Sequence, residues 1–167
     1  GDKLKSKFYL PEIKEYEITG IEPLFEMLDE RAQDLAQPFF RFLYNSVDGR
    51  EEKFQISFFE DKSKGNVNNN LLIIKNLTRK RALLFVSRVG YYKPCEGAVE
   101  FLPSLACFKD FLEDIENQIV EYGIKTGECG ICGKKLKDEK SIKLGIGPVC
   151  RKQLKNSKII YFSSYFK

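Results

Sequence analysis

Apolar residues recur with a helical period near the start of the chain. Between residues 22 and 37 they return every three or four positions, which is the spacing of one face of an amphipathic helix. Pro23 lies where the first turn of a helix accepts proline, and Pro38 closes the segment. Residues 1–11 have a polar, extended character, so we expect an extended segment followed by one helix.

The middle of the chain changes to the two-residue period of β-strands. Residues 54–58 alternate apolar and polar side chains, as in a strand with one buried face. Asp48 and Gly49 are a turn signal before this strand, and the Lys, Ser, Gly and Asn residues of 61–70 indicate a loop after it. We expect further strands at 39–44, 71–74 and 82–86, with a fifth at 98–102.

A second amphipathic helix is predicted over residues 104–122. Ser104 follows a proline and can cap the first turn, and Gly123 can end the helix. The whole pattern predicts an α+β fold in which a small antiparallel sheet is flanked by helices. Three regions follow from it: an extended segment and helix at 1–38, the sheet with its second helix at 39–122, and a cysteine-containing module with an aromatic tail at 123–167.

Composition narrows the class of protein. Of 167 residues, 43% are hydrophobic and 31% are charged, which is enough apolar material for a folded core. No apolar run approaches the ~20 residues of a membrane span, and no secretory signal is visible, so we expect a cytoplasmic protein without a membrane partner. The absence of histidine excludes Ser-His-Asp and Cys-His catalysis, an HNH-type nuclease and histidine-containing zinc sites. With no convincing carboxylate pair either, we expect no enzyme.

Positive charge is concentrated in two stretches of the sequence. Residues 39–93 hold 11 Lys and Arg against 5 Asp and Glu, and residues 123–167 hold 11 against 3. Basic surfaces attract phosphate backbones through counterion release, so nucleic acid is one expected partner. Solvated surface lysines are the plain alternative. Between two predicted strands, a basic tip is formed by Arg79, Lys80 and Arg81.

The five cysteines carry the sharpest chemical signal. Cys129 and Cys132 stand in a C-x-x-C-G sequence, whose spacing lets two sulfurs face one tetrahedral ion. Cys150 follows Pro148 and is expected in the first turn of a helix, where the helix dipole favours a thiolate. The segment between these two stretches can form a hairpin. Knuckle, hairpin and helix-borne ligand occur in this order in treble-clef and ribbon-type zinc modules, so we expect Zn²⁺ on Cys129, Cys132 and Cys150.

The fourth ligand stays open at this stage. Cys107 or Cys95 could return through the fold, Asp138 could supply a carboxylate, or water could fill the position. Cys95 and Cys107 are equally well explained as small apolar core residues. The cysteine motif also has two metal-free interpretations, which are a plain turn with reduced thiols and a redox C-x-x-C pair.

Basic residues crowd around the proposed zinc site. A small metal module has little interior, so these side chains must face solvent, which favours a polyanionic partner. The hypothesis is a zinc-stabilised accessory protein that binds nucleic acid with little sequence specificity. The alternative is a protein-interaction module. The candidate nucleic-acid contacts in this region are Lys134, Lys135, Lys143, Arg151 and Lys152.

The stretch from Tyr122 to Cys150 follows the pattern T-G-x-C-x-x-C-G-x-x-L-x-D-x-x-S-x-x-x-G-I-G-P-x-C. In this it resembles a domain-of-unknown-function family that occurs in phages and bacteria. The resemblance implies a phage or mobile-element setting and a bound zinc, and it implies no established activity. In that setting, the protein-interaction alternative is a module that binds a host enzyme or defence component during host takeover.

Overall fold

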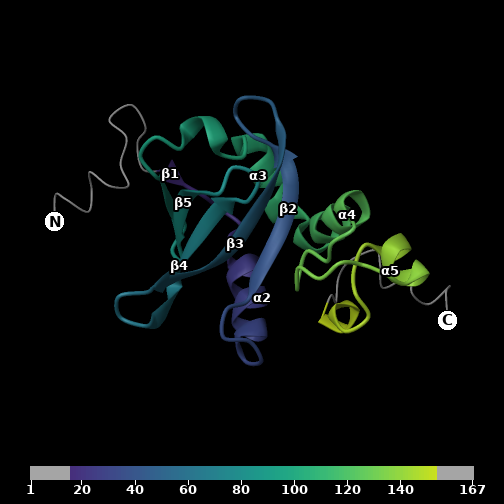
Figure 1. Cartoon of the computed structure of the whole chain (residues 1–167). Helices are drawn as coiled ribbons and strands as arrows, with labels where there is room; N and C mark the ends of the chain where they lie inside the picture. The colour runs from purple at the N-terminus through teal and green to yellow at the C-terminus, as the bar shows by residue number, and fades with distance from the viewer. Residues whose placement is uncertain (1–15, 154–167) are drawn as a thin grey trace.

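The computed structural model describes residues 16–153, and the predicted extended segment at 1–11 and the predicted aromatic tail lie outside them. The described chain is α+β, as the sequence pattern predicted (Figure 1). The elements in chain order are β1 (Tyr16–Glu17), α2 (Glu22–Ala32), β2 (Phe39–Asn45), β3 (Glu51–Asp61), β4 (Asn66–Asn76), β5 (Arg81–Ser87), β6 (Tyr91–Pro94), the 3₁₀ turn η1 (Val99–Phe101), α3 (Leu105–Glu113), α4 (Ile115–Thr126), α5 (Glu139–Leu144) and the 3₁₀ turn η2 (Cys150–Gln153).

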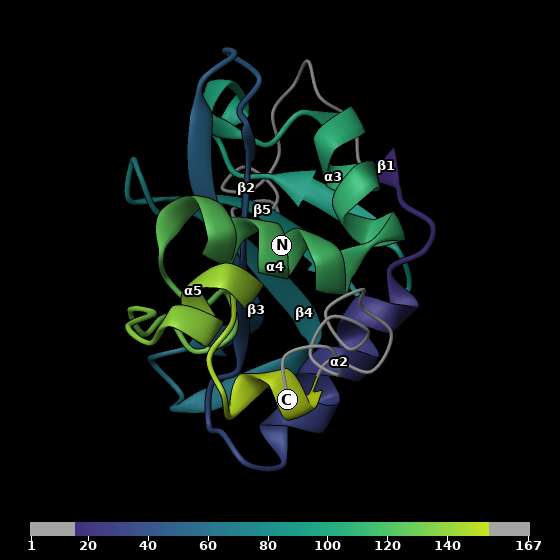
Figure 2. The ribbon, with the colours of Figure 1, turned by 90° about the vertical axis from the view of Figure 1, so that its right-hand side faces the viewer.

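The strands form one antiparallel sheet in the order β1-β6-β5-β4-β3-β2. Strands β2 to β6 follow one another along the chain and across the sheet, and the two-residue β1 adds to β6. Strand β2 is therefore an edge strand. Figure 1 shows α4, α5 and the cysteine-containing segment on the β2 side of this sheet, and Figure 2 shows the same segment facing the viewer.

One face of the sheet is packed against helices. Phe42 of β2 stacks on Phe54 of β3, with ring centroids 5.2 Å apart, and meets Phe111 of α3 at 4.5 Å. Phe25 of α2 contacts Phe58 of β3 at 6.3 Å between centroids. All five rings are buried, and each contributes roughly 1.5–3 kcal/mol of transfer free energy. The strand residues Phe42, Phe54 and Phe58 are therefore part of the core.

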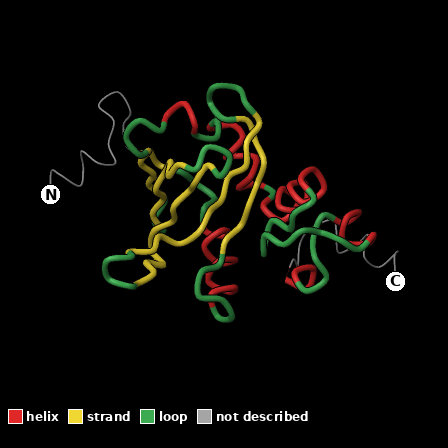
Figure 3. The backbone as a smooth tube through the Cα atoms, viewed as in Figure 1, coloured by secondary structure: helices red, strands yellow, loops and turns green. Residues whose placement is uncertain are grey.

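The opposite face of the sheet has a different character. Cross-strand partners place Phe39, Ser57, Ile73 and Phe85 in one row across β2 to β5. Phe59 packs edge-on against Phe85 at 5.4 Å on the same side. Phe39 and Phe59 remain partly exposed, so this face offers aromatic surface to solvent. Figure 3 draws the strands of this sheet in yellow and the helices in red.

One expected strand and one expected loop differ in the structure. Residues 98–102 are not a fifth strand, because Phe101 N–H bonds to Ala98 O at 3.0 Å and closes the turn η1. The fifth long strand is β6. The expected loop at 61–70 is shorter, because β4 begins at Asn66 and continues the ladder with polar residues. Backbone pairing needs no apolar side chains, so the polar composition concealed this part of the strand.

The helix boundaries also differ from the expected ones. The predicted helix at 22–37 ends at Ala32. The predicted helix at 104–122 is two helices, separated at Asp114, whose φ of −150° and ψ of 54° are not helical. The Ser104 cap is confirmed, because its hydroxyl oxygen accepts a hydrogen bond from the Cys107 amide at 3.2 Å. Within residues 16–153, no helix combines the length and apolar character needed to span a bilayer.

Gly123 lies inside α4 instead of ending it. The helix continues to Thr126, and Gly127 provides the left-handed cap, with a φ of 77°. A Cβ atom at Gly123 would lie 1.7 Å from the carbonyl oxygen of Gly145. Glycine is therefore required here by the close approach of α4 to the end of α5. This contact holds the segment with the cysteines against the sheet domain.

Candidate metal centre

A short hydrogen-bonded loop brings Cys129 and Cys132 together. The Cys129 amide donates to Lys134 O, and the Gly133 amide donates back to Cys129 O, both at 2.8 Å. Glu128 and Lys135 form an isolated antiparallel bridge at the base of the loop. These bonds fold the C-x-x-C-G sequence into a tight turn, so both sulfurs face the same side.

The loop is attached directly to the edge strand of the sheet. The Arg41 amide of β2 donates to Gly130 O at 2.7 Å, so the loop uses a backbone donor that an edge strand leaves free. A Cβ at Gly130 would lie 2.9 Å from Cγ2 of Ile119 and 3.1 Å from Arg41 O. Glu128 accepts from the Tyr122 hydroxyl at 3.0 Å and lies 3.7 Å from the Arg41 guanidinium. Burial and this hydrogen bond raise the pKa of Tyr122 to about 12.

Cys150 arrives through a short helix instead of the expected hairpin. Asp138 caps α5 by accepting from the Ser141 amide at 3.0 Å, and Gly145 ends the helix with a φ of 73°. The chain then turns at 147–149, and Cys150 begins η2. Part of the segment between the cysteine loop and Cys150 therefore forms the short helix α5, because Asp138 and Gly145 cap its two ends.

The three thiols converge on one point. The sulfur atoms of Cys129, Cys132 and Cys150 all lie within 4.8 Å of one another. Tetrahedral zinc with Zn–S bonds of about 2.3 Å places its sulfurs about 3.8 Å apart, so a small contraction would close the site. Cys129 and Cys150 are buried, and Cys132 is partly exposed. The three cysteines predicted from the motif can therefore hold a metal ion.

The surroundings already favour a thiolate in this cluster. The Cys150 thiol donates a hydrogen bond to Cys129, and the amides of Gly147, Cys132 and Ile131 also point to that sulfur; together they lower the pKa of Cys129 well below its usual range. The same hydrogen bond and burial raise the pKa of Cys150 well above its usual range. Because metal ligation requires deprotonated thiols, a cation would replace the proton held between these sulfurs.

The structure brings none of the expected fourth ligands into the cluster. Among the described residues, no further thiol or carboxylate joins the group of mutually close ligand atoms. Cys107 lies in α3 and Cys95 follows β6, both away from the loop. Asp138 acts as the cap of α5, and its hydrogen bonds with Ser141 lower the pKa of its carboxyl group. Within residues 16–153, the candidate site therefore consists of the three thiols alone.

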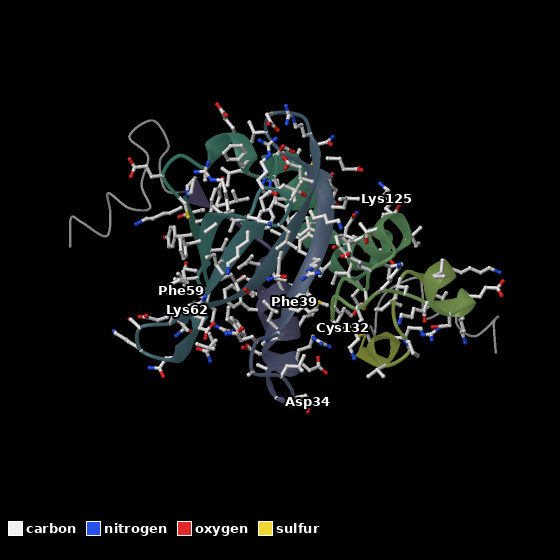
Figure 4. All side chains as sticks on the ribbon, in the orientation of Figure 1. Asp34, Phe39, Phe59, Lys62, Lys125 and Cys132 are labelled. Atoms are coloured by element: carbon white, nitrogen blue, oxygen red, sulfur yellow. The ribbon has the colours of Figure 1, made fainter. Side chains whose placement is uncertain are left out.

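A groove of about 740 Å³ opens beside the thiols. All three cysteines line it, together with Leu35 and Phe39 from the segment that connects α2 to β2 and from β2 itself. Figure 4 shows Asp34, Phe39 and Cys132 around this region, each on a different part of the chain. The groove therefore lies between the sheet domain and the cysteine loop. Sequence reasoning missed it, because its walls come from distant segments.

The predicted basic contacts near the cysteines differ in availability. Lys134 and Lys135 are exposed and line the groove, and Lys137, which the proposed contact set omitted, does the same. Lys143 pairs with Glu139 at 3.1 Å and does not line this groove. Arg151 is partly buried. Lys152 lies in η2, and its side chain is outside the described part of the chain.

The predicted basic tip at residues 79–81 is partly used inside the protein. The Arg79 guanidinium bonds to Glu52 and Asp48, each at 2.7 Å, and lies 4.5 Å from the Phe101 ring centroid. Arg81 approaches the same ring at 4.6 Å. Lys80 is exposed at the turn, with a φ of 57°. Arg79 is therefore committed to structure, which leaves it out of any surface that we propose below.

The Glu52–Arg79 pair gives a prediction on acid stability. Burial acts to raise the pKa of Glu52, but hydrogen bonds from Arg79 and Ser46 outweigh it, so the pKa lies below its usual 4.5. Its contribution is therefore complete above about pH 4.5 and is lost as the pH falls through the lower folded-state value. We expect Glu52→Gln to cost about 1–3 kcal/mol at pH 7 and less at pH 3.

Urea unfolding at both pH values measures this difference. Glu51→Gln is the matched control, since Glu51 is exposed and adjacent in the same strand. Equal losses for Glu52→Gln at the two pH values would show that the carboxylate charge does not stabilise the fold.

The comparisons with known proteins give a family match for the cysteine segment alone. No curated protein and no solved structure gives a significant match to the chain. Residues 120–155 match the model of DUF6011, a family of unknown function. The match begins within α4 and includes the whole cysteine loop, α5 and Cys150, so this part of the chain is similar to an uncharacterised domain family.

Proposed function

We propose that the protein is a zinc-stabilised nucleic-acid-binding protein with little sequence specificity. The observation that carries the proposal is the position of exposed lysines on the groove that the three thiols line. In this proposal the metal holds the cysteine loop in its folded shape, and the lysines beside the thiols carry the positive charge that attracts nucleic acid. The proposal assigns no catalytic role to the protein.

Zinc is the metal that best fits this donor set. Three thiolates form a soft site, and the reduced cysteines of Zn²⁺ sites with this C-x-x-C spacing are bound tetrahedrally. The loop followed by a ligand at the start of a helical turn supports a relation to treble-clef modules, although α5 replaces the hairpin. A water molecule or an outside ligand completes the coordination in this proposal.

The nucleic-acid surface in this proposal joins the groove to the open face of the sheet. Phe39 lines the groove and also lies on that face, where Phe59 is partly exposed as well, whereas Ile73 and Phe85 are buried. Partly exposed aromatic rings can stack on unpaired bases, and lysines can neutralise phosphates. A single strand would therefore find stacking and charge side by side. The phage or mobile-element setting implied by the sequence resemblance belongs to the same proposal.

The proposal is tested by replacing Lys134, Lys135 and Lys137 with glutamine in one variant. We expect single-stranded DNA binding to fall by about tenfold or more at ~50 mM salt, with a log–log salt slope smaller by about 2, since each lost phosphate contact removes ~0.7. Zinc content should stay that of the parent. The matched control replaces Arg50, Lys109 and Lys125 with glutamine, because all three are exposed and none of them lines the groove or the aromatic face of the sheet. Equal binding by both variants and the parent would contradict the proposed surface.

A protein partner is the second candidate function. Exposed acidic residues gather on α3, α4 and the break between them: Asp110, Glu113, Asp114 and Glu121. Such a surface repels nucleic acid and suits a basic protein face, for example on a host enzyme or defence component. If the parent binds neither DNA nor RNA at ~50 mM salt, where phosphate contacts are strong, this candidate replaces the first.

A further inference from the structure

Arg31 is a buried cation with two guanidinium nitrogens that have no visible partner. It lies in the last turn of α2, one helical turn after Leu28, on the face that packs inward. The residue is only 7% exposed, and its Nε and Nη1 atoms are buried with no hydrogen-bond acceptor among the described residues. A buried guanidinium is costly unless it is paired, so an arginine held in this state calls for an explanation.

Other arginines of the described chain show how this protein normally treats the side chain. Arg79 bonds to Glu52 and Asp48, and Arg88 makes a two-pronged contact with Asp29 at 2.9 and 3.0 Å. Arg41 donates to Gln55 at 3.0 Å. Each of these donors has an acceptor supplied by the fold. Arg31 differs from these three because no described residue accepts a hydrogen bond from its Nε or Nη1, a state that it shares with Nη1 of Arg151.

The groove beside the cysteines is where that acceptor can enter. Arg31 lines it, and so does Ser141, whose hydroxyl is also buried without a hydrogen-bond partner among the described residues. Two unsatisfied polar groups therefore come from α2 and α5, on separate parts of the chain. Buried polar atoms without partners are rare in folded proteins, and two on one groove indicate that a polar ligand belongs there.

The charge of the groove favours an anion. Its lining carries Arg31 and three lysines, Lys134, Lys135 and Lys137, against the carboxylates of Asp34 and Asp138. Asp138 is already occupied as the cap of α5. A guanidinium matches the paired oxygens of a phosphate, and the lysines raise the potential that attracts one. A phosphate group therefore satisfies both the charge and the missing acceptor.

The remaining walls indicate what the phosphate is attached to. Leu35, Phe39 and Val149 give the groove an apolar side with one aromatic ring. Its volume of about 740 Å³ lies within the usual ~300–1,000 Å³ of small-molecule sites. A planar base can pack against this side while its phosphate meets Arg31. We propose that the groove binds a nucleotide, either free or at the end of a strand, with its phosphate on Arg31.

This inference deepens the proposed nucleic-acid binding, and it rests on that proposal for the strand-borne source of the nucleotide. It is tested with the full-length, zinc-loaded protein by calorimetric titration of adenosine monophosphate and of adenosine. We expect the monophosphate to bind about tenfold or more tightly than adenosine, because only the monophosphate can accept from Arg31. No binding of the monophosphate, or equal affinity for both ligands, would overturn the inference.

The variant Arg31→Met separates a binding role from a structural one. Methionine has a similar volume and no charge, so removal of an unpaired buried cation should raise the melting temperature of the ligand-free protein. The same variant should bind the monophosphate about tenfold or more weakly, and Arg31→Lys should lie between it and the parent. Arg50→Gln is the control, since Arg50 is exposed in the turn after β2 and changes the charge equally. A lower melting temperature with unchanged affinity in Arg31→Met would assign Arg31 to the fold and overturn the proposal.

Short single strands with and without a 5′-phosphate distinguish the two sources. A preference for the phosphorylated strand that disappears in Arg31→Met supports a strand end, and monophosphate binding without this preference supports a free nucleotide. Failure of the inference is distinct from failure of the proposed function. If long single strands bind through the lysines but the monophosphate does not bind, the nucleotide site is contradicted and the proposed nucleic-acid binding is not. If the monophosphate binds through Arg31 but single strands do not bind, the proposed nucleic-acid binding is contradicted and the nucleotide site is not.

Discussion

Cys150→Ser should release the metal and destabilise the whole described domain. Structural zinc contributes apparent binding free energies of about 10–16 kcal/mol in small modules, so losing one of three ligands removes a large term. The effect should spread, because Cys129 and Cys150 belong to the same buried cluster as Phe42 and Ile56 of the sheet. We expect less than about a tenth of a zinc ion per chain and a fall of at least about 3 kcal/mol in the free energy of unfolding.

Zinc content by elemental analysis and unfolding by urea measure the two effects. Cys107→Ser is the matched control, because Cys107 is partly exposed on α3 and lies outside the cluster. Its zinc content should stay at one ion per chain. Retention of stoichiometric zinc in Cys150→Ser would remove Cys150 from the site. Loss of zinc with unchanged unfolding of the sheet would show that the module and the sheet are energetically independent.

Gly123→Ala should separate the cysteine module from the sheet domain. The new methyl group would lie 1.7 Å from Gly145 O, and this atom is backbone, which cannot rotate away. Either α4 or α5 must shift, so the contact that positions Cys150 relative to the loop is lost. Overpacking of this kind exceeds the usual ~1–3 kcal/mol of a core insertion, and we expect a loss of about 3 kcal/mol or more.

The control for this variant is Gly147→Ala. Gly147 also lies in the cysteine module, but a Cβ there meets nothing within 4 Å. We expect a change within about 0.5 kcal/mol, as for a substitution without new contacts. Thermal unfolding of both variants measures this difference in stability, and the zinc content of the same samples is measured as well. Similar stability for the two variants would contradict the close approach of α4 and α5.

Local chemistry made part of this structure predictable. Ser104 caps α3 and Asp48 and Gly49 turn the chain before β3, as expected, because such signals act within three or four residues. The three cysteines also converge as their spacing predicted. These features depend on short segments, whose preferences survive in the folded protein.

Features that depend on contacts between distant segments were not predictable. Gly123 resembled a helix terminator, and its real role is to let Gly145 approach. Residues 139–144 became α5 and not half of a hairpin, because Asp138 and Gly145 cap both ends. Arg31 is one of several charged residues in the predicted amphipathic helix, and only the packing of distant segments shows that it is buried on the groove.

X-ray absorption at the zinc edge of the full-length, reduced protein measures which atoms surround the metal. We propose that Cys129, Cys132 and Cys150 alone supply the protein ligands of one zinc ion. We therefore expect three sulfur atoms at about 2.3 Å and one oxygen or nitrogen at about 2.0–2.2 Å from zinc. Four sulfur atoms around the metal, or a protein that retains no zinc under reducing conditions, would contradict it.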